Sequence, residues 1–357
     1  MSLPFFNSSI ISGSTAHNLG GCGGGCLPVG GWVELGRTTL ACAGDDITVS
    51  CLADKRYYQI LFDGIGCGIV RGDIRLNCDT CNNYSSRNSS NGVAACPPDT
   101  STSSMNKFTN GDSYANLFGV GYLSNISTKE KLFIGHSNNN KTGVTNVPDR
   151  REMVGKHAQT SNPINAINVW QQSTGSWNTG SEVVVLGWDE SDTHTTNFWQ
   201  ELASVNATSG DNLSSGTFTA KKYLWIQMYM KYTSTGGVLH ETFNNDTCSN
   251  YASRDSYDGG VDGTSTCATH IDWDRGVQDT YYFVNQFIIN NASKEKLAIG
   301  HQLRIDSTET GAGTAPHRSE RVDKWANTSN QITEIDFDNT TGGIDISNGW
   351  LKVWGAD

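Results

Sequence analysis

Apolar residues along the chain come in short bursts, separated by clusters of Gly, Asn and Asp. Typical bursts are RYYQILFDG, NLFGVGYLSN, KLFIGH and EVVVLGW in the first half, and KYLWIQMYMKY, YYFVNQFIINN, KLAIGH and WLKVWG in the second. They are rich in β-branched and aromatic residues, and many alternate with a period of two, as strands with one buried face do. The pattern predicts an all-β chain, with one turn of helix near 150–157 as its exception.

One unit occurs twice along the chain. NCDTCNNYSSR (77–87) matches NNDTCSNYASR (244–254), and STKEKLFIGH, which ends at His136, matches ASKEKLAIGH, which ends at His301. Further on, PDRREMVGKHAQTSNPI matches PHRSERVDKWANTSNQI, and VVVLGWD matches LKVWGAD at the end of the chain. Four matches in the same order indicate an internal duplication.

The duplication predicts the domain organisation. We expect an N-terminal arm at 1–31, a first domain at 32–189, a linker at 190–197 and a second domain at 198–357. Each domain should be an antiparallel, jelly-roll-like β-sandwich of roughly eight strands, because this architecture buries alternating faces without long connections. The arm should be extended, since it is rich in glycine.

Composition narrows the classes of function. The 357 residues include 25 Lys and Arg against 36 Asp and Glu, a formal net charge of −11, which disfavours direct binding to nucleic acid. No stretch approaches the ~18 consecutive apolar residues of a membrane-spanning helix, and no signal peptide is recognisable at the N-terminus. Ten cysteines are nevertheless unusual for a cytosolic protein, and they predict a protein that is made in the cytoplasm and oxidises after release.

The sharpest duplicated block is KEKLxIGH. Its members are Lys129, Glu130, Lys131, Leu132, Ile134 and His136 in the first copy, and Lys294, Glu295, Lys296, Leu297, Ile299 and His301 in the second. An enzyme could use its histidine as a general base with the glutamate as partner. The alternative, which we favour, is a charged turn leading into a strand with the Leu and Ile on its buried side. An active site seldom persists in both copies of a duplicated chain.

A second duplicated set alternates charges. It comprises Arg150, Arg151 and Glu152 in the first copy and Arg318, Glu320 and Arg321 in the second. Planar guanidinium groups could bind an anionic sugar or a phosphate. Salt bridges that protect a sheet edge are the more common use of such alternation, and we take them as the default.

Aromatic residues and acidic turns offer two further hypotheses. Sugars stack on aromatic rings, so the tryptophans could bind glycan, although strand tryptophans more often lie in a core or a subunit interface. These tryptophans are Trp170, Trp177, Trp188, Trp199, Trp225, Trp273, Trp325, Trp350 and Trp354. Asp45, Asp46, Asp258 and Asp262 lie in turns that could hold Ca²⁺, but their spacing is not that of an EF-hand. We expect plain turns, no metal and no cofactor.

The cysteines fall into two groups. Cys81 and Cys248 occupy equivalent positions, and each is followed by one further cysteine, Cys96 or Cys267. This parallel predicts the disulfides Cys81–Cys96 and Cys248–Cys267, each of which would stabilise its domain by ~3 kcal/mol. Zinc is the alternative, because residues 78 and 81 form CxxC and residues 22 and 26 form CxxxC.

The other six cysteines lie in the first third of the chain and have no counterpart in the second copy. Cys42, Cys51, Cys67 and Cys78 are candidates for disulfides within the first domain or between subunits. Cys22 and Cys26 lie in the glycine-rich arm, which is free to reach a neighbouring subunit, so they are candidates for bonds between subunits.

Seven sequence blocks together resemble a group of virion proteins of tailed phages. They are WVELGRTTL, AGDDITVS, LADKRYYQILFD, NYSSRNSSNG, KEKLxIGH, PDRREMVGK and SEVVVLGWD. The resemblance covers nearly the whole first copy; the second copy has diverged further. The chain departs from the group in its many cysteines, at positions where Ser, Gly or Asn is expected. The resemblance implies a structural role at the particle surface.

We therefore expect a non-enzymatic decoration, fibre or collar protein at the virion surface. It should form a homo-oligomer, as a trimer or a ring, and bind other virion proteins. The alternative function is an adhesin module that binds host surface glycan. A depolymerase-like enzyme has the weakest support, because the sequence contains no GxSxG, no HExxH and no recognisable block of paired carboxylates.

Overall fold

The computed structural model describes residues 31–94, 97–109, 116–194, 196–234, 236–273, 281–306 and 311–357. Every regular element in these ranges is a β-strand, as the burst pattern predicts. The turn of helix expected near 150–157 is wrong: this segment is strand β10 (Asp149–His157), in which buried Met153 and half-buried Glu152 alternate across the sheet. Over the described ranges, no helix is long and apolar enough to cross a membrane.

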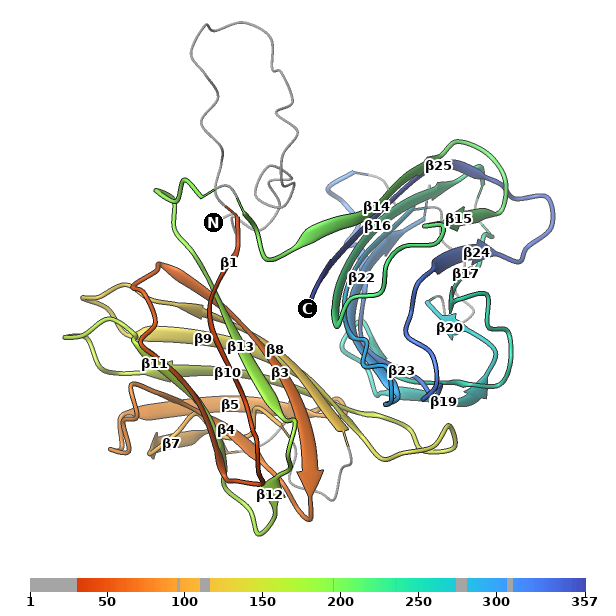
Figure 1. The fold of residues 1–357 in the computed structure, drawn as a ribbon. Helices are drawn as coiled ribbons and strands as arrows, with labels where there is room; N and C mark the ends of the chain where they lie inside the picture. Colours follow the sequence, from red (N-terminus) through yellow and green to blue (C-terminus); the bar gives the residue numbers. More distant parts are fainter. Residues whose placement is uncertain are drawn as a thin grey trace, which may run out of the picture.

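The first domain consists of two antiparallel sheets (Figure 1). The large sheet has the order β1-β13-β3-β8-β9-β10-β5-β6, with β12 beside β3 and β7 beside β5, and the small sheet has the order β2-β11-β4. The bounds of its strands are β1 Val33–Thr39, β2 Asp46–Ser50, β3 Tyr57–Cys67, β4 Gly72–Leu76, β5 Tyr84–Ser90, β6 Val93–Ala94, β7 Asp99–Thr102, β8 Asn116–Ser124, β9 Lys131–Asn140, β10 Asp149–His157, β11 Ala166–Gln171, β12 Ser176–Trp177 and β13 Glu182–Trp188.

The second domain repeats this arrangement. Its large sheet has the order β14-β25-β16-β21-β22-β23-β18-β19, and its small sheet the order β15-β24-β17-β20. The bounds of its strands are β14 Gln200–Ala207, β15 Asn212–Ser214, β16 Tyr223–Tyr232, β17 Leu239–Phe243, β18 Tyr251–Tyr257, β19 Gly263–Ala268, β20 Ile271–Asp272, β21 Tyr281–Ile289, β22 Lys296–Ile305, β23 His317–Trp325, β24 Ile335–Asn339 and β25 Ile346–Ala356.

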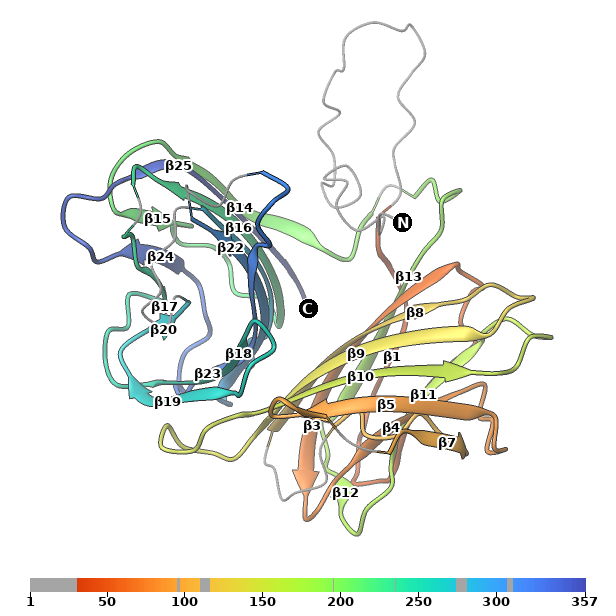
Figure 2. The same ribbon diagram turned by 180° about the vertical axis from the view of Figure 1, so that it is seen from behind.

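The chain thus forms two tandem β-sandwiches with matching strand order. The described strands number 13 in the first domain and 12 in the second, more than the roughly eight expected, because short strands such as β6, β12 and β20 extend the sheets. In both views the small sheet of the second domain lies on the side away from the first domain (Figures 1 and 2). The large sheet of the second domain therefore faces the first domain.

Each sandwich has its own hydrophobic core between its two sheets. Fully buried members include Ile60, Phe62 and Trp177 in the first domain and Ile226 and Trp273 in the second. The glycine of the IGH motif is explained by this packing. A Cβ at residue 135 would lie 2.8 Å from the Phe108 ring, and one at residue 300 would lie 2.7 Å from the indole of Trp273.

Three central strands are apolar on both faces. In β3, Ile60 and Phe62 point into the core of the first domain, whereas Leu61 belongs to a third cluster that lies between the domains. In β13, Val183 and Val185 face the core and Val184 faces the third cluster. Strand β16 follows the same rule. Runs such as ILF and VVVL reflect this double burial, since a strand with one solvated face would alternate.

The chain enters the first domain beside the linker. The amide of Gly31 donates to Asn197 Oδ1 at 2.9 Å, and the amide of Phe198 donates to the carbonyl of Trp32 at 2.7 Å. In the linker, Asp192 forms an ion pair with Lys55 of the first domain. The linker is thus bound to the first domain and does not act as a free spacer. The arm predicted at 1–31 lies, apart from its last residue, outside the described residues.

Candidate functional site at the domain interface

A continuous apolar cluster joins the outer faces of the two large sheets. The first domain contributes Trp32, Leu61, Phe118, Val120, Val184 and Leu186, and the second contributes Trp199, Tyr223, Trp225, Phe287, Ile289, Leu297, Ile299, Val322, Trp354 and Ala356. All of them are at least nine-tenths buried. Burial of a large apolar side chain stabilises by about 1.5–3 kcal/mol, so this cluster holds the two sandwiches against each other.

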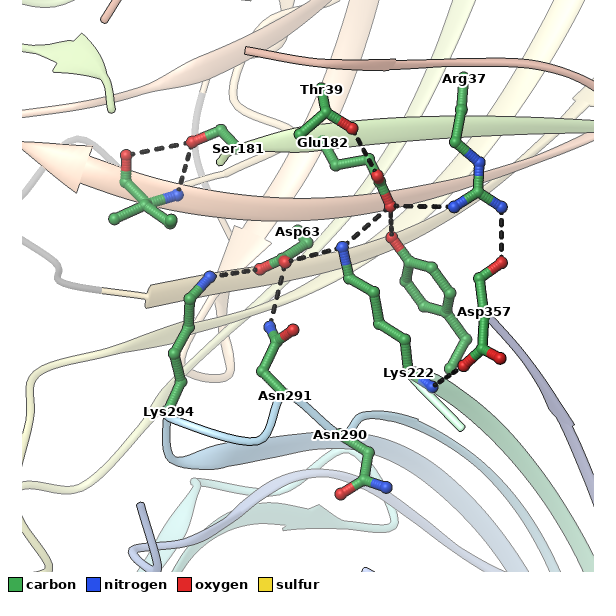
Figure 3. Close-up of polar contacts among 12 residues, drawn as sticks. Arg37, Thr39, Asp63, Ser181, Glu182, Lys222, Asn290, Asn291, Lys294 and Asp357 are labelled. Carbon is green, nitrogen blue, oxygen red and sulfur yellow. Dashed lines mark hydrogen bonds and ion pairs between the residues drawn. The ribbon is translucent and has the colours of Figure 1, made fainter. Parts of the chain in front are cut away.

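Two carboxylates of the first domain hold cations of the second domain at one end of the cluster (Figure 3). Lys222 Nζ lies between them, 3.2 Å from Asp63 Oδ2 and 2.9 Å from Glu182 Oε1. The hydroxyl of Tyr223 also donates to Glu182, at 2.9 Å, and Lys294 Nζ lies 3.3 Å from Asp63. Both carboxylates are buried, so the ion pairs are largely shielded from solvent screening.

The environment of Glu182 shows how this site favours the charged form. Burial alone would raise the pKa of its carboxyl, but hydrogen bonds from Thr39, Lys222 and Tyr223 outweigh that effect and lower the pKa. The bond from Thr39 Oγ1 is 2.6 Å long and comes from the edge strand β1 (Figure 3). With these three donors, the carboxylate of Glu182 remains ionised at neutral pH and keeps its ion pair with Lys222.

A second polar group lies at the other end of the cluster. Asn138 Nδ2 donates across the interface to the carbonyls of Ala298 and Asp323, at 2.9 and 2.8 Å. Lys324 is buried, and its Nζ donates to Asn140 Oδ1 at 2.8 Å. Burial lowers the pKa of Lys324, while the nearby carboxylate of Glu295 opposes that shift. These directional bonds therefore fix how the second domain is aligned on the first, which apolar contact alone would not do.

The histidines of the duplicated block meet across the interface. The rings of His136 and His301 lie edge to face, with their centroids 4.7 Å apart. Burial, together with the neighbouring charge of Arg150, lowers the pKa of both, so both are neutral at pH 7. Five strand steps of about 3.3 Å separate His136 from Lys131, so the adjacent Glu130 is too distant to orient its ring as a general base requires.

Arg150 connects the first domain to two carboxylates of the second. Its guanidinium binds Asp262 at 2.8 Å and Glu320 at 3.2 Å, and it also pairs with Glu152 on its own strand. Burial and the nearby Glu320 raise the pKa of Glu152 to about 7, although Arg150 opposes this shift. The carboxyl of Glu152 is therefore harder to ionise than a carboxyl in water.

The sheet-edge interpretation of the duplicated arginines is wrong. Strand β10 lies between β9 and β5, and β23 lies between β22 and β18, so neither is an edge. Arg321 instead lies in the core of the second domain beside Asp323 at 2.7 Å, and the exposed Arg318 pairs with Glu320 at 2.8 Å. Arg151 donates to Asn88 at 3.3 Å. Each guanidinium already has acceptors within the protein, which leaves no support for an anion site.

The KEKLxIGH block has a structural use in both domains. Lys131 and Lys296 are buried, and each donates to the carbonyl two residues before it, at 2.8 and 3.0 Å. Each also donates to a carbonyl beyond the next strand, from Lys131 to Gln159 at 3.2 Å and from Lys296 to Asn327 at 2.8 Å. The motif lysine therefore ties two loops together at equivalent places.

The Leu and Ile of the block were expected on the buried side of their strand, and this expectation is wrong for the first domain but confirmed for the second. They share the outer face with the histidine, because positions two apart lie on one face. In the first domain Leu132 is 55% exposed and Ile134 is 48% exposed, whereas in the second domain Leu297 and Ile299 are buried against the first domain. Duplicated residues thus have different surroundings in the two copies.

A loop motif is also repeated. Asp79 accepts hydrogen bonds from the backbone amide of residue 81 and from Asn83 Nδ2, both at 2.8 Å. Asp246 accepts the equivalent bonds from the amide of residue 248 at 2.9 Å and from Asn250 at 2.8 Å. The matching sequences NCDTCNNY and NNDTCSNY therefore encode the same loop, and their polar residues are occupied in forming it.

The cysteines of the described residues are free and exposed. They are Cys42, Cys51, Cys67, Cys78, Cys81, Cys248 and Cys267. The expected bond between Cys248 and Cys267 is not formed in the structure, because both are free thiols. Cys22, Cys26 and Cys96 lie outside the described residues, so the expected Cys81–Cys96 bond and the bonds expected from the arm stay predictions.

Most of the tryptophans are buried or packed on neighbouring side chains, and three of the acidic turn residues are bonded within the protein. Trp177, Trp199, Trp273 and Trp325 are fully buried, and half-buried Trp170 carries a guanidinium 3.4 Å above its ring. Half-buried Trp188 stacks on Tyr57, and Trp350 is half-buried, while Trp225 and Trp354 belong to the interface cluster.

The acidic turn residues bind partners within the protein. Asp46 accepts from Thr48, Asp258 binds His317, and Asp262 binds Arg150. Within the described ranges, no three His, Cys, Asp or Glu side chains are grouped so as to hold a metal.

Several interface residues were not singled out from the sequence. Asp63, Glu182 and Lys222 form its ionic end, and Asn138 and Asn140 form its amide end. Two signals could have identified them. A charged residue stands inside or beside an apolar burst in QILFDG and SEVVVLG. The four residues after IGH read SNNN in the first copy but QLRI in the second.

Comparison with known proteins assigns no family. No family model matches the chain, and no curated protein matches it. Among solved structures, Ail, the attachment invasion locus protein of Yersinia pestis in complex with the heparin analogue sucrose octasulfate, aligns over 76% of this chain and 98% of its own, at 4% identity and a TM-score of 0.13. Domains LG4-5 of the mouse laminin alpha1 chain align over 98% and 92%, at 8% identity and a TM-score of 0.18. Similarities this weak carry no argument about fold or function.

Proposed function

We propose that this chain is a non-enzymatic structural subunit of a tailed-phage particle, located at the particle surface as a decoration, fibre or collar component. The observation that supports the proposal best is the use of the duplicated residues. The motif lysines, Lys131 and Lys296, tie loops together, and the motif histidines, His136 and His301, lie against each other between the domains. The polar residues that an active site would need are engaged in holding the protein together.

The interface supports the same proposal. Enzymes and binding modules usually keep a concave, accessible site at a domain boundary. Here the boundary is filled by large apolar side chains, and the carboxylates at one end of it, Asp63 and Glu182, are bonded to the other domain. An interface of this kind holds the two sandwiches together as one unit, as a structural subunit of a particle requires.

Exposed thiols give such a subunit a means of cross-linking. Seven cysteines are exposed in the described residues, and thiols at a surface can pair between neighbouring subunits once the particle leaves the reducing cytoplasm. The proposal therefore includes disulfides between copies in the mature particle. Electrophoresis of particles without reductant tests this part: a ladder of multiples supports it, and a single band at the chain mass contradicts it.

The location is tested on purified particles. Virions of the phage that encodes the chain are banded by density, and their proteins are quantified by mass spectrometry against the major capsid protein. A fixed ratio across independent preparations supports a structural subunit. Absence from the banded particles, or a ratio that falls with each wash, contradicts the proposal. Labelling with antibody against the chain then distinguishes head, neck and tail.

A further inference from the structure

The outer face of each large sheet has two halves, which the duplication makes comparable. We call the first the motif half, formed by Leu132, Ile134 and Val154 in the first domain and by Leu297, Ile299 and Val322 in the second. We call the other the far half, formed by Phe118, Asn138 and Asn140 in the first domain and by Phe283, Leu303 and Ile305 in the second. Matching strand order and sequence offsets make these positions equivalent. His136 and His301 lie at the border between the halves.

The interface within the chain joins unlike halves. From the first domain it uses the far half, in which Phe118 is 1% exposed and Asn138 binds the backbone of Ala298. From the second domain it uses the motif half, in which Leu297 and Ile299 are 0% and 3% exposed. A contact between unlike surfaces is heterologous, and it leaves one unused half on each partner.

The two unused halves are apolar and open. In the motif half of the first domain, Leu132, Ile134 and Val154 are 55%, 48% and 50% exposed. In the far half of the second domain, Leu303 is 43% exposed. These residues occur together on the two adjacent strands β9 and β10 in one domain and beside half-buried Phe283 in the other, so each half is a patch rather than a single exposed side chain.

The charges around the motif half fit a second use of the same contact. In the second domain, Glu295 and Lys324 flank this half and lie buried against the first domain, where Lys324 donates to Asn140. In the first domain the equivalent pair is Glu130 and Lys156, 3.0 Å apart and exposed. The same apolar centre with the same ionic flank is therefore presented to solvent by the first domain.

We propose that the motif half of the first domain docks onto the far half of the second domain in another copy of this chain, so that copies assemble head to tail. The contact repeats in trans the pairing of motif half with far half that joins the two domains in cis. Leu303 and Ile305 stand where the first domain has Asn138 and Asn140, so the contact in trans is the more apolar of the two. A heterologous contact closes into a ring or continues as a filament, depending on its rotation.

This inference deepens the proposed function, because it names the partner of an assembling subunit, but its test needs no phage. The purified full chain is studied with reductant, so that thiols do not contribute, by light scattering after size exclusion over a range of concentrations. We expect species heavier than the 38.7 kDa chain. Ile134→Asp and Leu303→Asp should each weaken the association at least about tenfold, because a carboxylate would be buried without a partner.

Mixing the two variants tests the geometry. A chain with Ile134→Asp keeps an intact far half, and a chain with Leu303→Asp keeps an intact motif half. Head-to-tail docking therefore predicts that an equimolar mixture forms a dimer and nothing larger. If two motif halves packed on each other, Leu303→Asp would assemble like the wild type, and the proposal would be wrong.

Two controls keep the result interpretable. Val261→Asp changes a residue that is 93% exposed and lies outside both halves, and it should leave assembly unchanged. If Ile134→Asp does not fold, Val154→Asp replaces it on the neighbouring strand of the same half. A wild-type chain that stays monomeric at high concentration overturns the inference and leaves the proposed place on the particle to be judged by the particle experiment.

Discussion

The core between the two sheets carries a buried polar network in the second domain and uncharged residues at the same positions in the first. In the second domain, Arg321 donates to Asp323 at 2.7 Å, and Glu241 accepts from the indole of Trp273 at 3.0 Å and from Gln286 at 3.1 Å. All of these groups are buried. The equivalent residues of the first domain are Ile74, Met153 and Gly155. One strand order therefore accommodates either kind of core, and the network is not a requirement of the fold.

On the outer faces of the two large sheets, one equivalent pair of residues is the same in both domains and its burial differs. The pair of Glu130 and Lys156 is exposed in the first domain, whereas the equivalent pair of Glu295 and Lys324 is buried in the second. The residue types are identical in the two pairs, yet their solvent exposure differs. The duplication thus provides matched pairs in which residue type is constant and burial varies.

The largest expected effect comes from removing the cation of the inner network. Arg321→Met introduces the residue of the first domain but leaves Asp323 and Glu241 buried without it. Loss of one partner of a buried pair costs about 3–5 kcal/mol. Urea unfolding followed by tryptophan fluorescence should show this loss in the second domain. The free energy of unfolding is the quantity compared.

The matched variant replaces the network as a whole. A triple variant with Glu241→Ile, Arg321→Met and Asp323→Gly gives the second domain the residues of the first. It should recover at least half of the loss, because the buried carboxyl groups of Glu241 and Asp323 are removed together with the cation beside them. A triple variant as unstable as Arg321→Met alone would show that the two cores are not interchangeable.

A smaller effect separates the two outer lysines. Lys324→Met removes the donor to Asn140 and to the carbonyl of Gly143, and leaves Glu295 buried, so it should cost about 2–3 kcal/mol. Lys156→Met removes an exposed ion pair and should cost less than about 0.5 kcal/mol. Thermal unfolding of both variants measures the difference. Equal costs would contradict the assignment of Lys324 to the interface.

Periodicity and repeats predicted the all-β fold and the two copies, because both depend on local patterns that each strand satisfies by itself. The interface depends on which outer face meets which, and alternation does not encode that. Strands such as YLWIQMYM and EVVVL did carry a signal, since consecutive apolar residues indicate burial on both faces. The segment RREMVGK forms part of a strand that carries charged residues on both faces, so its sequence does not show a clear period of two.

The site was predicted less well for a related reason. His136 and His301 were identified as a pair by repetition, but their contact across the interface follows from the packing of whole sheets. The ionic end, with Asp63, Glu182 and Lys222, has no counterpart in the other copy, so repetition could not reveal it. Residues that break the symmetry of a duplication are best found by comparing its copies position by position.

The smallest effect concerns pH and the inner network. Burial raises the pKa of Glu241 to about 8, with Asp323 contributing in the same direction. A carboxyl whose pKa is higher in the folded than in the unfolded state stabilises the fold at low pH, and this contribution is lost as pH rises through the folded pKa. Between pH 7 and pH 9 the loss amounts to about 1 kcal/mol.

A second group acts in the opposite sense, so the variant is needed to isolate the effect. Burial lowers the pKa of Lys296 to about 8, and its contribution to stability therefore grows as pH rises above that value. Glu241→Gln removes the ionisable carboxyl and leaves Lys296 unchanged. The free energy of unfolding of this variant, relative to the wild type, should rise by about 1 kcal/mol from pH 7 to pH 9. A difference that stays constant over this range would mean that Glu241 is already ionised in the folded domain. The core of the second domain would then stabilise a buried charge, which the apolar core of the first domain has no groups to do.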